Sequence, residues 1–191
     1  MNRRSKLAQA PARALALAAA ALLAACSGMP GAARPPAFDQ ATLPEAVRVP
    51  AGHKVALETV GVGEITYECR AKAAAMDAQE WVFVGPQADL NGRNGAKLGS
   101  YFGPPATWAA ADGSTITGTQ LAVAPNGAGN IPLQLVKANP ASGAGAMMGI
   151  SYVQRVATRG GTAPASACDK SGLGRKEIVK YQADYIFWKA S

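Results

Sequence analysis

The sequence is poor in the residues from which metal and catalytic centres are built. It holds a single histidine, His53, and no cysteines at Cys-x-x-Cys spacing, which argues against a metal site. No serine lies in a Gly-x-Ser-x-Gly elbow, and no Gly-x-Gly-x-x-Gly motif occurs, so the common hydrolase and dinucleotide-binding signatures are missing. We therefore predict no cofactor, no metal and no catalytic residue.

Long runs of like charge are also missing. Four of the nineteen lysines and arginines precede Cys26, whereas none of the twelve acids does, so the formal charge of +7 overstates the basicity of the remaining chain. From Cys26 onward, fifteen basic residues stand against twelve acidic ones. Without a basic patch or a Lys/Arg-rich helix, we expect no nucleic-acid partner.

The first 26 residues have the pattern of an export signal. Three basic side chains lie within the first six residues, and an apolar run over 12–25 follows, interrupted only by Arg13. The run is too short for a permanent membrane span. Leu23-Ala24-Ala25-Cys26 resembles the lipobox of bacterial lipoproteins, which implies cleavage before Cys26 and lipidation of its sulfur. An ordinary signal peptide, with Cys26 discarded or left free, is the alternative.

These features suggest three parts of the chain. We predict a signal peptide over 1–25, a flexible tether rich in proline, alanine and glycine over 26–42, and one folded domain over 43–191. The residue after the predicted lipidation site is Ser27, whereas an aspartate there would favour retention in the inner membrane. By analogy we expect the protein to be anchored in the outer membrane, facing the periplasm or the surface. The expected partners are the membrane, through the lipid, and an envelope polysaccharide or protein.

Within the domain, most segments have the pattern of strands. Apolar and polar residues alternate over 55–59, 65–69 and 179–187, and short apolar runs cover 81–84, 115–123, 131–136 and 149–158. Asp112-Gly113 predicts a tight turn. Only 70–79 suggests a helix, and a long loop suits it equally well. We predict an all-β fold, a single β-sandwich or barrel-like domain of about eight or nine short strands.

Lipidation would leave Cys69 and Cys168 as an even pair in an oxidising compartment. We predict a disulfide between them that ties the region before the last strand to the early half of the domain. In the chain-entropy model, closing a loop of about one hundred residues stabilises the folded state by roughly 4 to 5 kcal/mol.

Several segments together resemble an uncharacterised family of exported bacterial and fungal proteins, classed as a domain of unknown function. The resemblance covers nearly all of 43–189 and supports export, a single domain and the two cysteines, but it implies no activity. The segments that carry it include Tyr67-Glu68-Cys69, Trp81-Val82-Phe83-Val84-Gly85-Pro86-Gln87-Ala88, Tyr152-Val153-Gln154-Arg155-Val156-Ala157-Thr158-Arg159-Gly160-Gly161, Cys168-Asp169 and Tyr181-Gln182-Ala183-Asp184-Tyr185-Ile186-Phe187.

Four aromatic residues are the candidate ligand-binding residues. Tyr101, Phe102 and Trp108 form an aromatic and proline-rich cluster, and Trp188 lies on the mostly polar face of the last strand. If exposed, such rings stack on sugars or apolar partners; if buried, they are core, and core or rim packing is the favoured interpretation for the cluster.

Two arginines near the end of a predicted strand are a weaker candidate. Arg155 and Arg159 have guanidinium groups that hold a carboxylate or phosphate well. An internal role, pairing with Asp169 or Asp184, is the favoured interpretation. Residues 89–95 resemble a calcium loop only superficially, and an Asn-Gly hairpin explains them better.

Two hypotheses for function follow. The first is a non-enzymatic binding or structural module of the cell envelope, with an unknown ligand. The second is a periplasmic hydrolase or oxidoreductase with an acid-based site, which would need two acids, or an acid and His53, together in one pocket. Glu64 and Glu68 share a strand face, but about 13 Å of strand rise separates them, which is too far for a catalytic pair.

Overall fold

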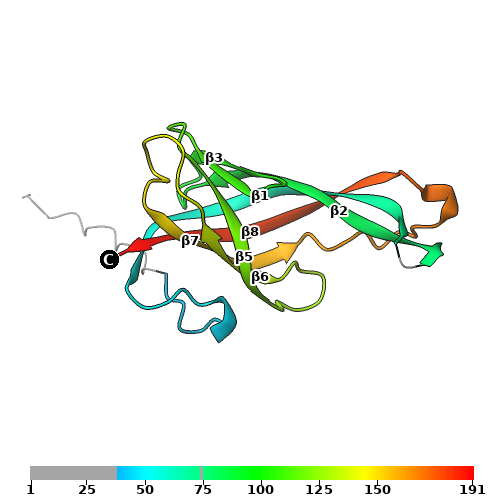
Figure 1. Ribbon diagram of the computed structural model, residues 1–191, viewed down its shortest axis with the longest axis horizontal. Helices are drawn as coiled ribbons and strands as arrows, with labels where there is room; N and C mark the ends of the chain where they lie inside the picture. Colours follow the sequence, from blue (N-terminus) through cyan, green and yellow to red (C-terminus); the bar gives the residue numbers. More distant parts are fainter. Residues whose placement is uncertain (1–37, 74) are drawn as a thin grey trace, which may run out of the picture. The chain divides into compact units, whose positions relative to one another are not determined.

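The computed structural model describes residues 38–73 and 75–191 (Figure 1). The described chain folds as one compact unit, Phe38–Ser191. The predicted signal peptide, Cys26 and most of the predicted tether lie outside the described residues. No helix in the described part is long and apolar enough to cross a membrane.

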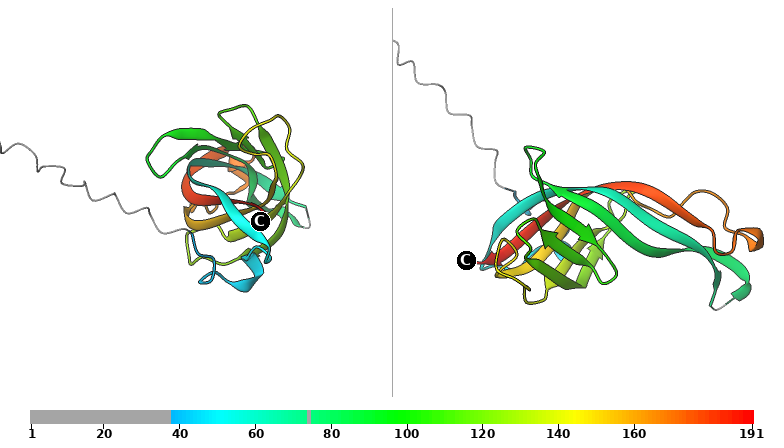
Figure 2. Two further views of the ribbon diagram at one scale, coloured as in Figure 1. Left: turned by 90° about the vertical axis from the view of Figure 1, so that its left-hand side faces the viewer. Right: turned by 90° about the horizontal axis from the view of Figure 1, so that it is seen from above.

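Eight antiparallel strands form one closed sheet, in which each strand pairs with the next and β8 returns to β1 (Figure 2). Two single-turn 3₁₀ helices are the only other regular elements among the described residues, so the prediction of an all-β fold is confirmed. Closure of β8 onto β1 makes it a barrel and not two packed sheets. The elements are η1 (Glu45–Val47), β1 (His53–Lys72), β2 (Ala75–Asn91), β3 (Lys97–Phe102), β4 (Thr107–Ala110), β5 (Thr115–Ala124), β6 (Leu133–Ala138), β7 (Ile150–Gly160), η2 (Lys170–Gly172) and β8 (Lys176–Ala190).

Strands β1, β2 and β8 are longer than the sequence predicted. The runs 55–59 and 65–69 belong to one strand, β1. Where a helix or a loop was expected, residues 70–72 continue β1 and residues 75–79 begin β2, and the two strands pair with each other. Gly61 lies between the two runs and marks no turn. A Cβ at this position would lie 2.5 Å from the ring of Tyr185, so the glycine leaves room for that ring inside the barrel.

The long strands continue past one end of the barrel. β1 stays paired with β2 as far as Lys72 and with β8 as far as Lys176, whereas β7 leaves β8 at Tyr181. β1, β2 and β8 therefore form a three-stranded extension beyond the ring, which Figure 1 shows clearly. We call the barrel end beside the extension the mouth and the other end the closed end.

Alternation along the strands sends one set of side chains inward and another outward. Inward residues of all eight strands form the main core, which includes Trp108, Tyr185 and Phe187. Outward residues of β5 to β8 form a second apolar cluster with Val47 and Val49. Residues 38–49, which we call the strap, cover this cluster across the outside of the barrel.

The strap shows that the folded body begins earlier than predicted. Phe38 packs edge-on against Trp188, with ring centroids 6.2 Å apart. The Gln40 side chain both donates to the carbonyl and accepts from the amide of Val49. Residues 38–42, expected to belong to the tether, are therefore part of the domain. Their partners come from β1, β7 and β8, which a reading of local composition cannot reveal.

Loops tied by hydrogen bonds cover the closed end. Asp112 accepts from the backbone and hydroxyl of Ser114 and from the amide of Ala146, and the Ser114 hydroxyl accepts from the amide of Met147. Met147 is 1% exposed and belongs to the main core. The predicted Asp112-Gly113 turn is confirmed, and it is fastened to the loop between β6 and β7.

Candidate ligand-binding site

A pocket of about 310 Å³ opens at the mouth of the barrel. We call it the mouth pocket. The first part of the extension forms one wall, through Tyr67 of β1 and Phe83 of β2, and β6 and β7 form the facing wall. Eight-stranded barrels have room inside for side chains or for one small ligand, and barrel mouths are a frequent place for ligand sites.

One part of the pocket wall is formed where the backbone of β2 comes close to the loop between β3 and β4. A Cβ on Gly85 would lie 2.2 Å from the carbonyl oxygen of Gly103, so only glycine allows β2 to contact the loop after β3. This contact holds Pro104, which follows a cis peptide bond, beside the pocket. The wall is therefore apolar here and is held by a direct backbone contact.

Arg155 is the one charged residue among those lining the mouth pocket. Its neighbours Gln154 and Val156 point outward to the strap, so the strand period directs Arg155 inward. The guanidinium donates to the carbonyl of Pro132 through Nε (3.2 Å) and Nη2 (2.9 Å). It makes no ion pair with a described residue.

The charge of this guanidinium acts on four tyrosine hydroxyls. Tyr67 donates to the carbonyl of Gly161, and the hydroxyls of Tyr181 and Tyr185 lie 3.1 Å apart in a mutual hydrogen bond. Burial raises the pKa of Tyr181 to about 12 and that of Tyr185 well above 10. Burial also raises the pKa of Tyr67 and Tyr101, and the Arg155 charge opposes the rise at all four hydroxyls. These phenols therefore stay protonated at neutral pH.

Of the four aromatic candidates, only Tyr101 lines the mouth pocket. It is 6% exposed and stacks on Trp108, with ring centroids 4.9 Å apart. Trp108 is 1% exposed in the barrel interior, as the core interpretation expected. Phe102 is exposed but points away from the pocket. The prediction that Trp188 is exposed is wrong, because the strap covers it and its Nε1 donates to Gln154.

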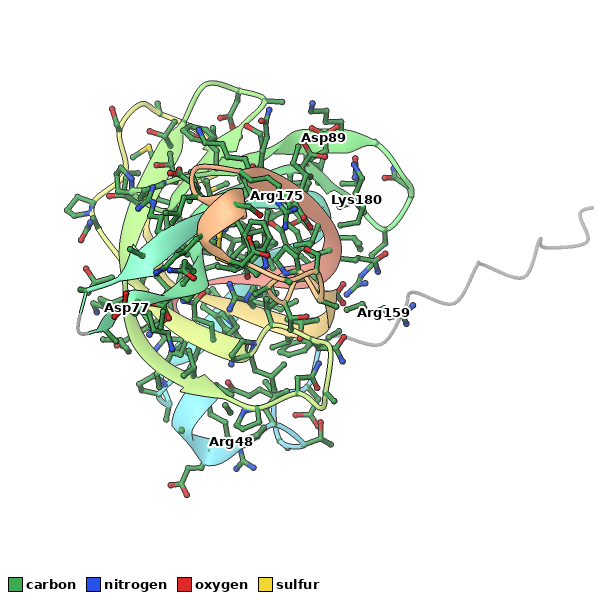
Figure 3. All side chains as sticks on the ribbon, turned by 90° about the vertical axis from the view of Figure 1, so that its right-hand side faces the viewer. Arg48, Asp77, Asp89, Arg159, Arg175 and Lys180 are labelled. Atoms are coloured by element: carbon green, nitrogen blue, oxygen red, sulfur yellow. A yellow bond between two sulfur atoms is a disulfide. The ribbon has the colours of Figure 1, made fainter. Side chains whose placement is uncertain are left out.

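The internal ion pairs predicted for the arginines are also wrong. Asp184 points to the outside of the barrel and pairs with Arg93 at 2.7 Å. Asp169 caps η2 by accepting from the amides of Ser171 and Gly172. Because β8 alternates, Asp184 and inward-facing Arg155 lie on opposite faces of the sheet. Arg159 is exposed near the outer edge of the ring (Figure 3).

The acids needed for an acid-based site do not meet. None of the twelve lines the mouth pocket. Glu64 pairs with Lys180 and Glu68 with Arg70, both on the outer face. His53 packs edge-on against Tyr152 and lies 3.0 Å from the carbonyl oxygen of Pro50. Within 38–73 and 75–191, no three His, Cys, Asp or Glu side chains form a metal-binding group.

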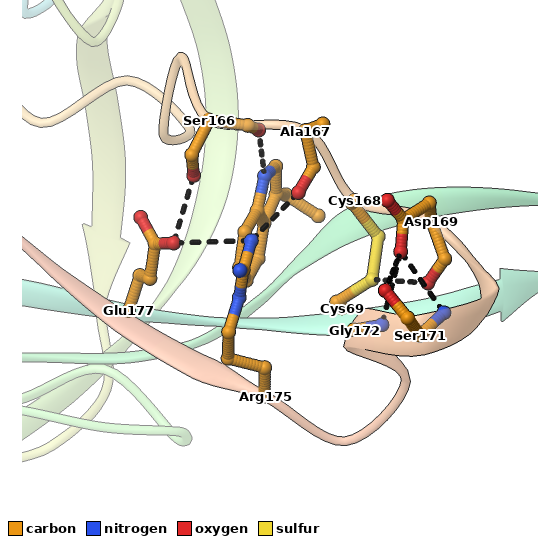
Figure 4. The surroundings of a disulfide bond; sticks show 10 residues. Cys69, Ser166, Ala167, Cys168, Asp169, Ser171, Gly172, Arg175 and Glu177 are labelled. Carbon is orange, nitrogen blue, oxygen red and sulfur yellow. Dashed lines mark hydrogen bonds and ion pairs between the residues drawn. A yellow bond between two sulfur atoms is a disulfide. The ribbon is translucent and has the colours of Figure 1, made fainter.

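The tip of the extension is locked by the predicted disulfide, which is confirmed. Cys69 and Cys168 are joined over a separation of 99 residues, with Cα atoms 5.5 Å apart (Figure 4). Arg175 packs over Trp81 at 5.2 Å and donates to the carbonyl of Ala167. The loop between β7 and β8 is thus fastened to β1 and β2, beside the mouth.

A second, larger groove of about 700 Å³ lies at the closed end, among residues 137–151. It is more open to solvent than the mouth pocket, and loop residues make up most of its lining. No described aromatic side chain lines it. The mouth pocket is therefore the better candidate site.

Sequence reasoning missed most of the pocket wall. Gln120 and Gln134 lie in it, with Gln134 Nε2 donating to Gln120 Oε1, yet each reads as a solvent-facing polar residue of its strand. Tyr67 and Phe83 appeared only as apolar positions of two strands. The sequence did hold one clue to the pocket. Arg155 lies two residues after Val153, which is buried, so strand alternation directs both side chains to the inside of the barrel.

With the geometry described, comparison with known proteins gives one match. The family model described as "Protein of unknown function (DUF3455)" matches residues 50–189. The chain belongs to this family. The resemblance drawn from the sequence segments is thereby confirmed, and the DUF3455 match begins after the strap and includes every residue of the mouth pocket. Neither a curated protein nor a solved structure matches the chain.

Proposed function

We propose that this DUF3455 chain is a binding module of the cell envelope whose mouth pocket takes a small, largely apolar ligand. The observation that carries the proposal is the pocket itself: about 310 Å³, walled by Tyr67, Phe83 and Tyr101, with a few convergent polar groups. Small-molecule sites have this size and composition.

An extended polysaccharide or a flat protein face has less support. Stacking on either needs exposed rings in a row, whereas Trp108 and Trp188 are buried and Tyr101 is accessible only through the pocket. A hydrolase or oxidoreductase with an acid-based site has no supporting observation in the described chain, because no acid reaches the mouth pocket.

Binding is tested with a neutral phenyl-naphthylamine dye, whose fluorescence rises in apolar surroundings. We expect saturable binding to the wild-type protein. Phe83→Ala removes an apolar part of the wall and should weaken the dye affinity by about five- to tenfold, which is the scale of one partly buried aromatic side chain. Phe102→Ala is the matched control, because Phe102 is similarly exposed but outside the pocket. Equal loss in both variants, or no saturable binding, would refute the mouth pocket as the site.

Attachment to a membrane is the second part of the proposal and is supported by the pattern ending in Leu23-Ala24-Ala25-Cys26. Mass spectrometry of the mature protein should show a lipid-modified Cys26 as its first residue. Cys26→Ala should move the protein from the membrane fraction to the soluble one or leave it unprocessed. An unmodified thiol at Cys26 would contradict lipid anchoring without affecting the pocket.

A further inference from the structure

Arg155 is a partly exposed cation of the pocket lining with spare hydrogen-bond donors. A guanidinium has five N–H groups, and the two bonds to Pro132 use two of them. These bonds also fix the orientation of the group against the pocket wall. No described acid pairs with it, although the described acids hold eight ion pairs elsewhere with other cations.

A second donor lies in the same pocket. The Tyr101 side chain is 6% exposed and lines the pocket, and its hydroxyl forms no hydrogen bond with any residue the structure describes. The neighbouring hydroxyl of Tyr67 is already committed to Gly161. Arg155 and Tyr101 thus leave the pocket with unused donors and no acidic side chain that could accept from them.

An unpaired cation in a largely apolar pocket is costly, and an anion that accepts from it lowers that cost. Because Arg155 is the single charged residue of the lining, the pocket matches one negative charge. A carboxylate meets this requirement, and its planar pair of oxygens fits the guanidinium fork. A phosphate ester, with up to two negative charges, would be left half-neutralised.

From these observations we infer that the mouth pocket recognises a small organic carboxylate, with Arg155 and Tyr101 donating to the carboxylate and the apolar walls holding its hydrocarbon part. This inference rests on the proposed function of the pocket and adds the chemical class of its ligand.

The test compares three naphthalene compounds that share an apolar body: a naphthoate, the neutral naphthamide and naphthyl phosphate. Each competes with the neutral dye for the wild-type protein. We expect the naphthoate to bind at least about tenfold more tightly than the naphthamide, the scale of a charge-assisted hydrogen bond. We also expect it to bind more tightly than the phosphate.

Variants then assign the effect to its residues. Arg155→Met should weaken the naphthoate far more than the naphthamide or the dye, so that the preference for the naphthoate over the naphthamide disappears. Tyr101→Phe should weaken the naphthoate by a smaller factor, of about three- to tenfold. Arg159→Met is the matched control, because this arginine belongs to the same strand but is not part of the pocket. It should change nothing.

The outcomes separate the two proposals. Dye binding with no preference for naphthoate over naphthamide overturns the carboxylate inference while the pocket stands. A preference for the phosphate, or a preference that survives Arg155→Met, also overturns it. Absence of dye binding refutes the proposed function first. The wild-type comparison of naphthoate and naphthamide needs no variant, so the test holds even if Arg155→Met folds poorly.

Discussion

At the scale of single residues, Asp112 joins two loops at the closed end of the barrel. One carboxylate oxygen accepts from the hydroxyl (2.6 Å) and amide of Ser114, and the other accepts from the amide of Ala146 at 2.7 Å. These bonds, that of the Ser114 hydroxyl foremost, hold the pKa of Asp112 below its usual 3.8. The charged form therefore stabilises the folded state.

A depressed pKa fixes the sign of the pH dependence. The stabilisation by Asp112 is fully present above the unfolded pKa, near 4, and is lost as pH falls through the lower folded pKa. Asp112→Asn should lower the melting temperature by a few degrees at neutral pH, and the gap to wild type should close below pH 4. Thermal melts across pH measure this. Asp89→Asn is the control, because Asp89 is exposed and pairs only with Lys97. A gap that does not change with pH would contradict the role of the charge.

Gly61 illustrates a second residue-scale requirement, which is space inside the barrel. An added methyl group would lie 2.5 Å from the Tyr185 ring, which is fully buried and has little room to move. Gly61→Ala should cost about 1 to 3 kcal/mol of unfolding free energy, the usual range for overpacking. Gly172→Ala is the control, because its methyl group would meet neighbours at an ordinary 3.7 Å. Urea unfolding of both variants compares them, and equal losses would refute the steric argument.

At the scale of elements, the strap matters because the family match begins at residue 50, after it. Val47 is 0% exposed and Val49 is 4% exposed. Gln154, itself buried, donates to the carbonyl of Val47 and accepts from Trp188 Nε1. The strap thus covers an apolar face of the barrel and satisfies its buried polar groups.

A chain that begins at residue 50 should therefore fold less stably than one that begins at Phe38. Loss of the buried valines and of the Phe38 contact should lower the unfolding free energy by on the order of 3 to 6 kcal/mol, an upper estimate from apolar area. Chemical unfolding of the two chains measures the difference. The chain beginning at Phe38 should match the full-length protein from which the signal has been removed. Equal stability of the two shortened chains would show that the strap adds nothing.

At the scale of the whole molecule, the disulfide joins regions that the strand order alone leaves loosely connected. Beyond the ring, the extension has neither β3 nor β7 beside it. The loop from β7 to β8 is joined to the extension by few backbone hydrogen bonds, chiefly those between Cys69 and the residues Gly174 and Arg175. The bridge fastens this loop beside the mouth, so it supports the pocket wall formed by β1 and β2.

The double variant Cys69→Ala/Cys168→Ala tests this support. In the chain-entropy model the bridge adds at most roughly 4 to 5 kcal/mol, so the melting temperature should fall markedly under non-reducing conditions. Wild type in a reductant should approach the variant, and the variant should not respond to reductant. Hydrogen exchange should rise most in residues 161–175. An unchanged melt after verified reduction would contradict the stabilising role of the bridge.

The sequence by itself determined the strands and the cysteine pairing. Alternation along β1 and β8 and the even pair Cys69 and Cys168 are local or countable properties, and the segments shared with the DUF3455 family extend over most of the domain. The tight turn at Asp112-Gly113 could also be predicted from the sequence. It depends on a glycine that adopts a positive φ, here +88°, and this is a local property of the residue.

Only the tertiary structure decided which residues meet. Closure of β8 onto β1 turned alternating faces into an inside and an outside, and this placed Arg155 in a pocket and Asp184 on the outer surface. The strap buried Trp188 on a face that reads as mostly polar. Strand period tells which side chains share a face, whereas the curvature and pairing of the sheet determine what that face encloses.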